Sequence, residues 1–317
     1  MFYLYRKIKI SGDGEFLFRH RKKRVTNPKA YSQIQMIIKV LVENSVYSGA
    51  PKGIKAEHGL SLYIETATDK ILFDTGRSDL FLRNAAKMGI NLAEVDHLIL
   101  SHGHSDHGGG LAHFLKANRS ATVWMHREAT RDFYVKALGI IPFYVGLDKK
   151  VLERYKERIR YVEERQDITR NLKVFSGMRG NFPLPAGNSH LFIKEDGRWK
   201  KDDFRHELLL AIEGEGNGTV LCTGCSHSGI INMIECYGKH AESLPVSAAV
   251  GGFHLYSRMT GKSEPQNYID RLSEALSEQN ICLYTGHCTG VKNYAYMKLK
   301  LQDKLNSLHS GQELLFL

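Results

Sequence analysis

The most informative segment of this 317-residue chain is VDHLILSHGHSDH, residues 95–107. Its first half, residues 95–100, is a short apolar run of the kind that forms a buried strand. Its second half places three histidines and one aspartate within six positions, at His102, His104, Asp106 and His107. Imidazole and carboxylate groups are ligands suited to Zn²⁺, and also to Fe or Mn. We therefore predict a metal site in the loop that follows this strand.

The spacing within the loop indicates how the ligands are shared. His102 and His104 alternate by two, so in an extended loop both can face one ion. Asp106 and His107 follow directly and can turn toward a second ion. Gly103 permits the tight backbone that this crowding requires. Two ions about 3.5–4 Å apart would activate a bridging water and hold an oxyanion.

Three further apolar runs each end in a glycine-rich loop that carries a histidine: His227, His254 and His287. Loops at the ends of rigid strands are where binding and catalytic sites are usually built. We predict His227 and His287 as metal ligands. His254 could be a ligand, a proton donor or a substrate contact. His58 we interpret as a surface or structural histidine.

These segments carry a family resemblance. Residues 102–107 match the HxHxDH signature of the metallo-β-lactamase superfamily, and residues 73–76 match its upstream Asp-Thr-Gly element. Four further motifs resemble one branch, the superfamily II metal-dependent hydrolases, which includes the 7,8-dihydropterin-6-methyl-4-(ribofuranosyl)aminobenzene-phosphate synthases. These motifs are Glu57-His58-Gly59-Leu60-Ser61, Gly224-Cys225-Ser226-His227, Gly251-Gly252-Phe253-His254 and Thr285-Gly286-His287-Cys288-Thr289-Gly290.

The resemblance implies an α/β fold, an αββα sandwich of two mixed sheets flanked by helices, with the site at one edge of the sheets. It implies that His102, His104 and His227 hold a first ion, and that Asp106, His107 and His287 hold a second. Asp106 would also take up a proton during turnover, so we predict Asp106 and His254 as catalytic residues. Asp74 would brace the ligand loop rather than bind metal.

Cys225 departs from the family pattern. Many dinuclear members have a bridging Asp in a Gly-Asp step after a strand, whereas the comparable step here reads Gly224-Cys225. Either Cys225 replaces that carboxylate, or His227 is the only ligand from this loop.

The pattern along the chain predicts its organisation. Regular structure begins at Met36, so we predict a basic extension over residues 1–35 and a sandwich domain over residues 36–317. Residues 127–200 show weak periodicity and look like an insertion or lid. Within them, the charged stretch 149–164 has the pattern of an amphipathic helix.

Composition limits the partners and the compartment. No apolar run approaches the roughly 18 residues of a membrane span, so we predict no membrane partner. The apolar start is too short for a secretion signal, and five cysteines make no disulfide framework, so we expect a cytoplasmic protein. Residues 1–35 hold +7 of the net charge of +10, which makes a nucleic-acid groove on the folded body improbable. The sequence leaves a homo-oligomer open.

The sequence therefore predicts a metal-dependent hydrolase, or a related synthase, that uses metal-activated water on a small, phosphorylated or pterin-like substrate. One or two divalent ions are expected, with Zn²⁺ favoured over Fe or Mn. Two alternatives stay open: a metal-dependent nuclease on the same fold and a non-hydrolytic di-iron redox protein. Deleting residues 1–35 would distinguish the nuclease from the other two functions. If the protein is a nuclease, the deletion should abolish a salt-sensitive affinity for nucleic acid.

Overall fold

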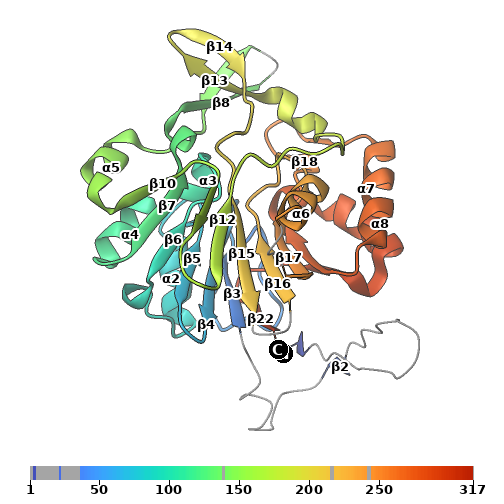
Figure 1. The fold of residues 1–317 in the computed structure, drawn as a ribbon, viewed down its shortest axis with the longest axis horizontal. Helices are drawn as coiled ribbons and strands as arrows, with labels where there is room; N and C mark the ends of the chain where they lie inside the picture. The colour runs from blue at the N-terminus through green and yellow to red at the C-terminus, as the bar shows by residue number, and fades with distance from the viewer. Residues whose placement is uncertain are drawn as a thin grey trace.

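The computed structural model describes residues 3–4, 21–22, 36–137, 140–214, 218–240 and 244–316. Two large β-sheets pack face to face, and helices cover their outer faces (Figure 1). The predicted αββα sandwich is therefore confirmed. The predicted extension over residues 1–35 lies outside the described residues, apart from two short strands, β1 (Tyr3–Leu4) and β2 (Arg21–Lys22).

The first sheet has nine strands in the order β10-β7-β6-β5-β4-β3-β22-β1-β2. The second has seven strands in the order β11-β12-β15-β16-β17-β20-β21. Besides β1 and β2, the strands of the first sheet are β3 (Met36–Val42), β4 (Ser61–Thr66), β5 (Lys70–Phe73), β6 (His97–Ile99), β7 (Thr122–His126), β10 (Ile159–Val162) and β22 (Glu313–Phe316). Those of the second are β11 (Arg165–Asp167), β12 (Leu172–Phe175), β15 (Leu209–Gly214), β16 (Gly218–Cys222), β17 (Val246–Gly252), β20 (Cys282–Gly286) and β21 (Leu305–Ser307).

Strand periodicity explains how the layers are held together. In β15, Leu210 and Ile212 point into the core between the sheets, while Leu209 and Ala211 pack under the outer helices. Burial on both faces accounts for the continuous apolar runs in the sequence. The helices that cover the sheets are α2 (Leu80–Lys87), α4 (Leu111–Ala117) and α5 (Lys149–Arg154) on the first, and α6 (Ile230–Gly238), α7 (Gln266–Glu278) and α8 (Val291–Leu301) on the second.

The predicted helix over residues 149–164 is wrong. Helix α5 ends at Arg154, and β10 follows as a strand parallel to β7 at the edge of the first sheet. Both of its anchoring side chains are buried: Val162 packs in the core between the sheets, and Ile159 packs under the outer helices of the first sheet. Pairing with β7 and burial of these two side chains outweigh the local helical pattern.

Residues 127–200 divide between two parts of the fold. Strands β10, β11 and β12 belong to the two large sheets. A separate four-stranded sheet lies at the top of Figure 1, made of β8 (Asp132–Ala137), β9 (Ile141–Tyr144), β13 (Leu191–Glu195) and β14 (Arg198–Lys201). A lid role for this small sheet stays a prediction.

The part of the chain that the structure describes contains no helix long and apolar enough to cross a membrane.

Candidate metal centre

Five of the loops that meet at one edge of the sandwich carry site residues expected from the sequence, and each of the five follows a strand. Asp74 follows β5, the stretch His102–His107 follows β6, and Cys225 and His227 follow β16. His254 comes after β17, and His287 lies at the end of β20. Because β5, β6, β16, β17 and β20 include parallel neighbours, their carboxyl ends meet at the same edge. The short helix α3 (Ser105–Gly108) begins inside the ligand loop.

His102, His104 and His227 form a first cluster, whose nitrogen atoms lie within 4.8 Å of one another. Their rings are 4.6–5.1 Å apart between centroids. All three side chains are buried, and the Nε2 atom of each has no hydrogen-bond partner among the described residues. A buried nitrogen without a partner costs about 1–3 kcal/mol, so three that converge on one point call for an occupant.

His58, Asp106 and His287 form a second cluster. The Oδ2 atom of Asp106 lies 3.3 Å from Nε2 of His58 and 3.3 Å from Nε2 of His287. His58 and Asp106 are only about four-fifths buried, so this cluster borders the cavity. We interpreted His58 from the sequence as a surface or structural histidine, so its place in this cluster was not predicted. The motif Glu57-His58-Gly59 was the available signal.

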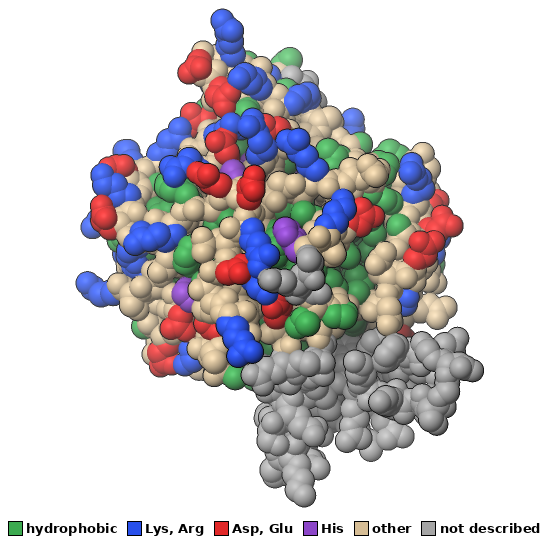
Figure 2. Space-filling model, viewed as in Figure 1, with side chains coloured by type: hydrophobic (Ala, Val, Ile, Leu, Met, Phe, Trp, Pro, Cys, Tyr) green, Lys and Arg blue, Asp and Glu red, His purple; other side chains and the backbone are tan. Residues whose placement is uncertain are grey.

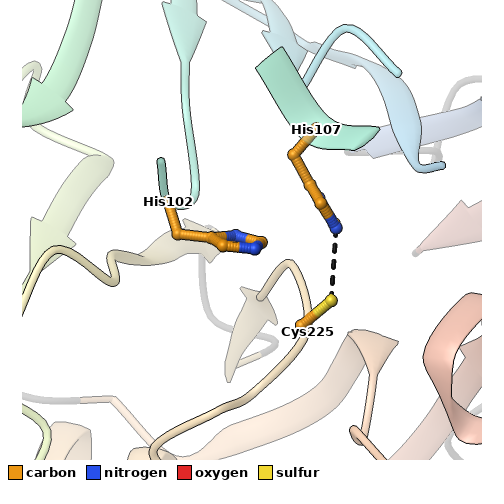
Figure 3. A group of neighbouring side chains, drawn as sticks. All are labelled: His102, His107 and Cys225. Carbon is orange, nitrogen blue, oxygen red and sulfur yellow. Dashed lines mark hydrogen bonds between the residues drawn. The ribbon is translucent and has the colours of Figure 1, made fainter. Parts of the chain in front are cut away.

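His107 lies between the two clusters. Its Nε2 atom is 3.1 Å from Nε2 of His287 and 3.2 Å from Sγ of Cys225, the contact drawn in Figure 3. The same atom is 4.0 Å from the carboxylate of Asp106. Burial alone would lower the pKa of His107, but the charges of Asp74 and Asp106 outweigh it and raise the pKa to about 9.

Asp74 braces the ligand loop through three hydrogen bonds. It accepts the backbone N–H of Ser101 at 2.8 Å and the Ser101 hydroxyl at 2.7 Å. Its Oδ2 atom also lies 2.6 Å from Nδ1 of His107. These bonds fix the ring of His107 with Nε2 toward the centre.

Several supporting groups were not found from the sequence. The buried carboxylate of Glu207 accepts the backbone N–H groups of His227 and Ser228, each at 2.8 Å. Asp202 lies 3.2 Å from Nε2 of His206 and 3.7 Å from Nε2 of His104. Further partners are Asn188 at Nδ1 of His227, Glu43 at the backbone N–H of His287 and Asn44 at Nδ1 of His287.

Four loop residues of the site adopt left-handed backbone conformations, at Asp74 (φ 59°), Ser226 (58°), His254 (48°) and His287 (51°). Such conformations cost about 1–3 kcal/mol each in residues other than glycine. Gly224 shows how tight the centre is, because a Cβ atom there would lie 2.2 Å from the hydroxyl of Ser101. The fold thus holds these loops against local preference.

His254 and Cys225 lie beside the clusters. The His254 ring is 4.1 Å from the His227 ring between centroids, and its Nδ1 atom has no hydrogen-bond partner in the described part of the chain. Cys225 lies close to residues of both clusters. Its sulfur lies within 4.8 Å of ligand atoms in three pairs of residues: His102 and His107, His227 and His254, and His287 and Cys288. Burial raises the pKa of the Cys225 thiol.

A cavity of about 550 Å³ opens onto both clusters. His104, Asp106, Cys225, His227, His254 and His287 all contribute to its lining. Val135 of β8 and Leu191 of β13 line it from the small sheet. The structure therefore brings all the predicted site residues together. His102 and His107 do not line the cavity and are buried behind the residues that do.

The residues present fit a bound cation. Burial, together with the charge of nearby histidines, lowers the pKa values of His102 and His227, and burial lowers that of His104. Neutral imidazoles are the form that binds metal. Asp106 stays ionised, because His107 and His287 outweigh the effect of its burial and hold its pKa well below the ordinary value.

Comparison with known proteins agrees with this arrangement. The model of the metallo-β-lactamase superfamily matches residues 54–230, more than half of the chain. The chain belongs to the metallo-β-lactamase superfamily, whose members bind one or two metal ions.

Three relatives cover most of the chain. It is 31% identical to MJ0448 of Methanocaldococcus jannaschii over 87% of this chain and 98% of that one. It is 29% identical to the 7,8-dihydropterin-6-methyl-4-(beta-D-ribofuranosyl)-aminobenzene-5'-phosphate synthase of the same organism, over 88% of this chain and 97% of the synthase. Among solved structures it is similar to Tm1679, a metal-dependent hydrolase of the beta-lactamase superfamily, with a TM-score of 0.71, 30% identity, and coverage of 88% and 98%.

Proposed function

We propose that the protein is a metal-dependent hydrolase, or a related synthase, that acts on a small organic substrate in the cavity above the two clusters. The observation that carries the proposal is the convergence of three buried, unpartnered Nε2 atoms, from His102, His104 and His227. These three residues would hold a first divalent ion. Asp106, His107 and His287 would hold a second, with His58 beside them.

When bound, such ions lower the pKa of a coordinated water and stabilise negative charge that develops on the substrate. The side chains of this protein supply the rest. Asp106 belongs to the second cluster and also lines the cavity, which suits it to receive a proton. His254 lines the cavity beside His227 with a free ring nitrogen, which suits it to donate a proton or to contact the substrate.

Zn²⁺ is the ion we favour, with Fe or Mn as alternatives, because a proposed ligand set that is rich in imidazole and has a single carboxylate, Asp106, suits zinc. The substrate class is proposed from the relatives. The aminobenzene-phosphate synthase carries a pterin and a phosphate in its name, and a small phosphorylated or pterin-like substrate would fit a cavity of this size. We also propose a cytoplasmic location.

Metal quantification on protein purified without added metal tests the proposal, followed by a panel of phosphoesters and lactones. Wild-type protein should hold one to two equivalents of metal and turn over at least one class of substrate. His104→Ala should lose metal and at least about 10²-fold of the activity, since it removes one of three ligands of the first ion. His113→Ala, at an exposed histidine on α4, is the matched control. Unchanged activity in His104→Ala contradicts the proposal.

A further inference from the structure

The charges around the cavity are unbalanced. Two arginines, Arg77 and Arg258, line it, whereas Asp106 is the sole carboxylate among the described residues of the lining. Asp106 already lies within 3.3 Å of His58 and His287. A bound divalent ion would add to the positive potential. The cavity therefore favours a negatively charged ligand.

Arg77 and Arg258 reach the cavity from opposite sheets. Arg77 follows the Asp74-Thr75-Gly76 loop at the end of β5, the loop that braces His107. Arg258 lies in the turn between β18 (Tyr256–Ser257) and β19 (Lys262–Ser263), which follows the His254 loop. Each arginine is thus attached to a segment that also carries a residue of the centre.

Neither guanidinium is engaged by the part of the protein that the structure describes. Both residues are exposed, and within the described ranges neither side chain has a hydrogen bond or an acidic partner. Some other arginines of this protein are used structurally: Arg131 pairs with Glu195 and Asp203, and Arg158 donates to the backbone oxygens of Asn118 and Ala121. Two unpaired guanidinium groups on one cavity are therefore available to a ligand.

The remaining lining indicates what the anion is attached to. Val135, Val145, Leu191 and Met259 give the cavity an apolar wall, and Tyr256 adds an aromatic ring. A volume of about 550 Å³ is in the range of small-molecule sites. The wall suits a flat or apolar body, and the arginines suit an oxyanion, because the planar guanidinium presents paired donors that match phosphate oxygens.

We propose that Arg77 and Arg258 are specificity-determining residues that together hold the phosphate group of a small organic phosphate with an apolar or aromatic body. The inference rests on the proposed function for its reaction, but the binding step does not require turnover. A dianionic phosphate engages both arginines, whereas a carboxylate has one negative charge and engages them less strongly. A neutral analogue lacks the contact.

Calorimetric titration of phenyl phosphate into the protein as purified with its metal tests this step. Arg77→Ala and Arg258→Ala should each weaken binding about tenfold, and the double variant by about 100-fold, because each removes a charge-assisted contact. Arg119→Ala, an exposed arginine outside the cavity, is the control and should bind like wild type. Benzoate should bind more weakly than phenyl phosphate, and benzyl alcohol more weakly still.

Two readouts separate this inference from the function on which it rests. Metal content and melting temperature should be unchanged in the arginine variants, because both side chains lie outside the core. Phenyl phosphate affinity in the double variant within about threefold of wild type would overturn the inference. So would affinity that is lost in His104→Ala but kept in the double variant, since the ions alone would then hold the phosphate. Absence of metal or of turnover in wild type would instead count against the proposed function.

Discussion

The two clusters of the centre are built differently, although they are neighbours. In the first, His102, His104 and His227 are buried, and their Nε2 atoms form no hydrogen bond with any described residue. In the second, His58, Asp106 and His287 pair with one another and border the cavity. An unsatisfied buried cluster gains most from an ion, whereas a cluster that satisfies itself gains less. We therefore expect a tight first ion and a second ion that is more easily lost.

The variants His102→Ala and His58→Ala test this difference in metal affinity most clearly, because each removes one residue from one cluster. Removing His102 takes one of three ligands from the first ion, and its affinity should fall by about 10²–10³-fold. Removing His58 should weaken only the second ion, by about tenfold, since Asp106, His107 and His287 remain. Titration with a metal chelator, followed by metal analysis, measures both. Equal losses in the two variants would show that the clusters are not distinct.

The acid stability of the metal-free protein should be dominated by the first cluster. The pKa values of His102, His104 and His227 lie below 6.5 in the fold, so below pH 6.5 the unfolded chain binds protons that the folded chain does not. The free energy of unfolding should therefore fall as the pH drops below 6.5, by up to about 1.4 kcal/mol per pH unit for each group.

His107 acts in the opposite sense. Its pKa is raised to about 9, so its stabilising effect is present below pH 6.5 and is lost as the pH rises toward 9. Urea unfolding of the metal-free protein should show maximal stability near pH 6.5–7, and His102→Asn should make the acid slope shallower. A flat profile between pH 7.5 and 5.5 would contradict this account.

Glu207→Ala should loosen the first cluster without removing a ligand. It leaves the buried N–H groups of His227 and Ser228 without their acceptor, which should cost about 3 kcal/mol of stability in the metal-free protein. Glu274→Ala, at an exposed position on α7, should cost far less. Equal urea midpoints for the two variants would show that Glu207 does not stabilise the loop that carries His227.

Cys225→Ser tests whether the Cys225 sulfur binds the second ion, and we expect its effect on metal affinity to be the smallest of these variants. The sulfur lies 3.2 Å from Nε2 of His107 and groups with residues of both clusters. If it binds the second ion, cobalt-loaded wild type should show the near-ultraviolet absorption of sulfur bound to cobalt, and the serine variant should lose it. Affinity for the second ion should fall about tenfold. Identical spectra would leave His227 as the only ligand from this loop.

The family resemblance predicted the sandwich, and local patterns predicted where the histidine-bearing loops lie. The ligand loop follows β6 as expected, and His227, His254 and His287 follow the strands predicted for them, because a buried strand and the loop after it are both encoded locally. The helix over residues 149–164 failed because β10 is stabilised by β7, a partner that local periodicity does not reveal.

The supporting residues could not be read from the sequence for the same reason. Glu207 contacts His227 across twenty positions, and Glu43 contacts His287 across 244. Neither belongs to a motif with ligand spacing, so only the fold brings them to the loops. His58 is the intermediate case, since its motif was visible but its partners, Asp106 and His287, lie in other loops.

Anomalous diffraction at the absorption edge of the native metal is the most direct test of the centre. We predict a strong peak bonded to Nε2 of His102, His104 and His227, and a weaker peak beside Asp106 and His287. Bound metal located elsewhere, with these three imidazoles still unpartnered, would contradict the account.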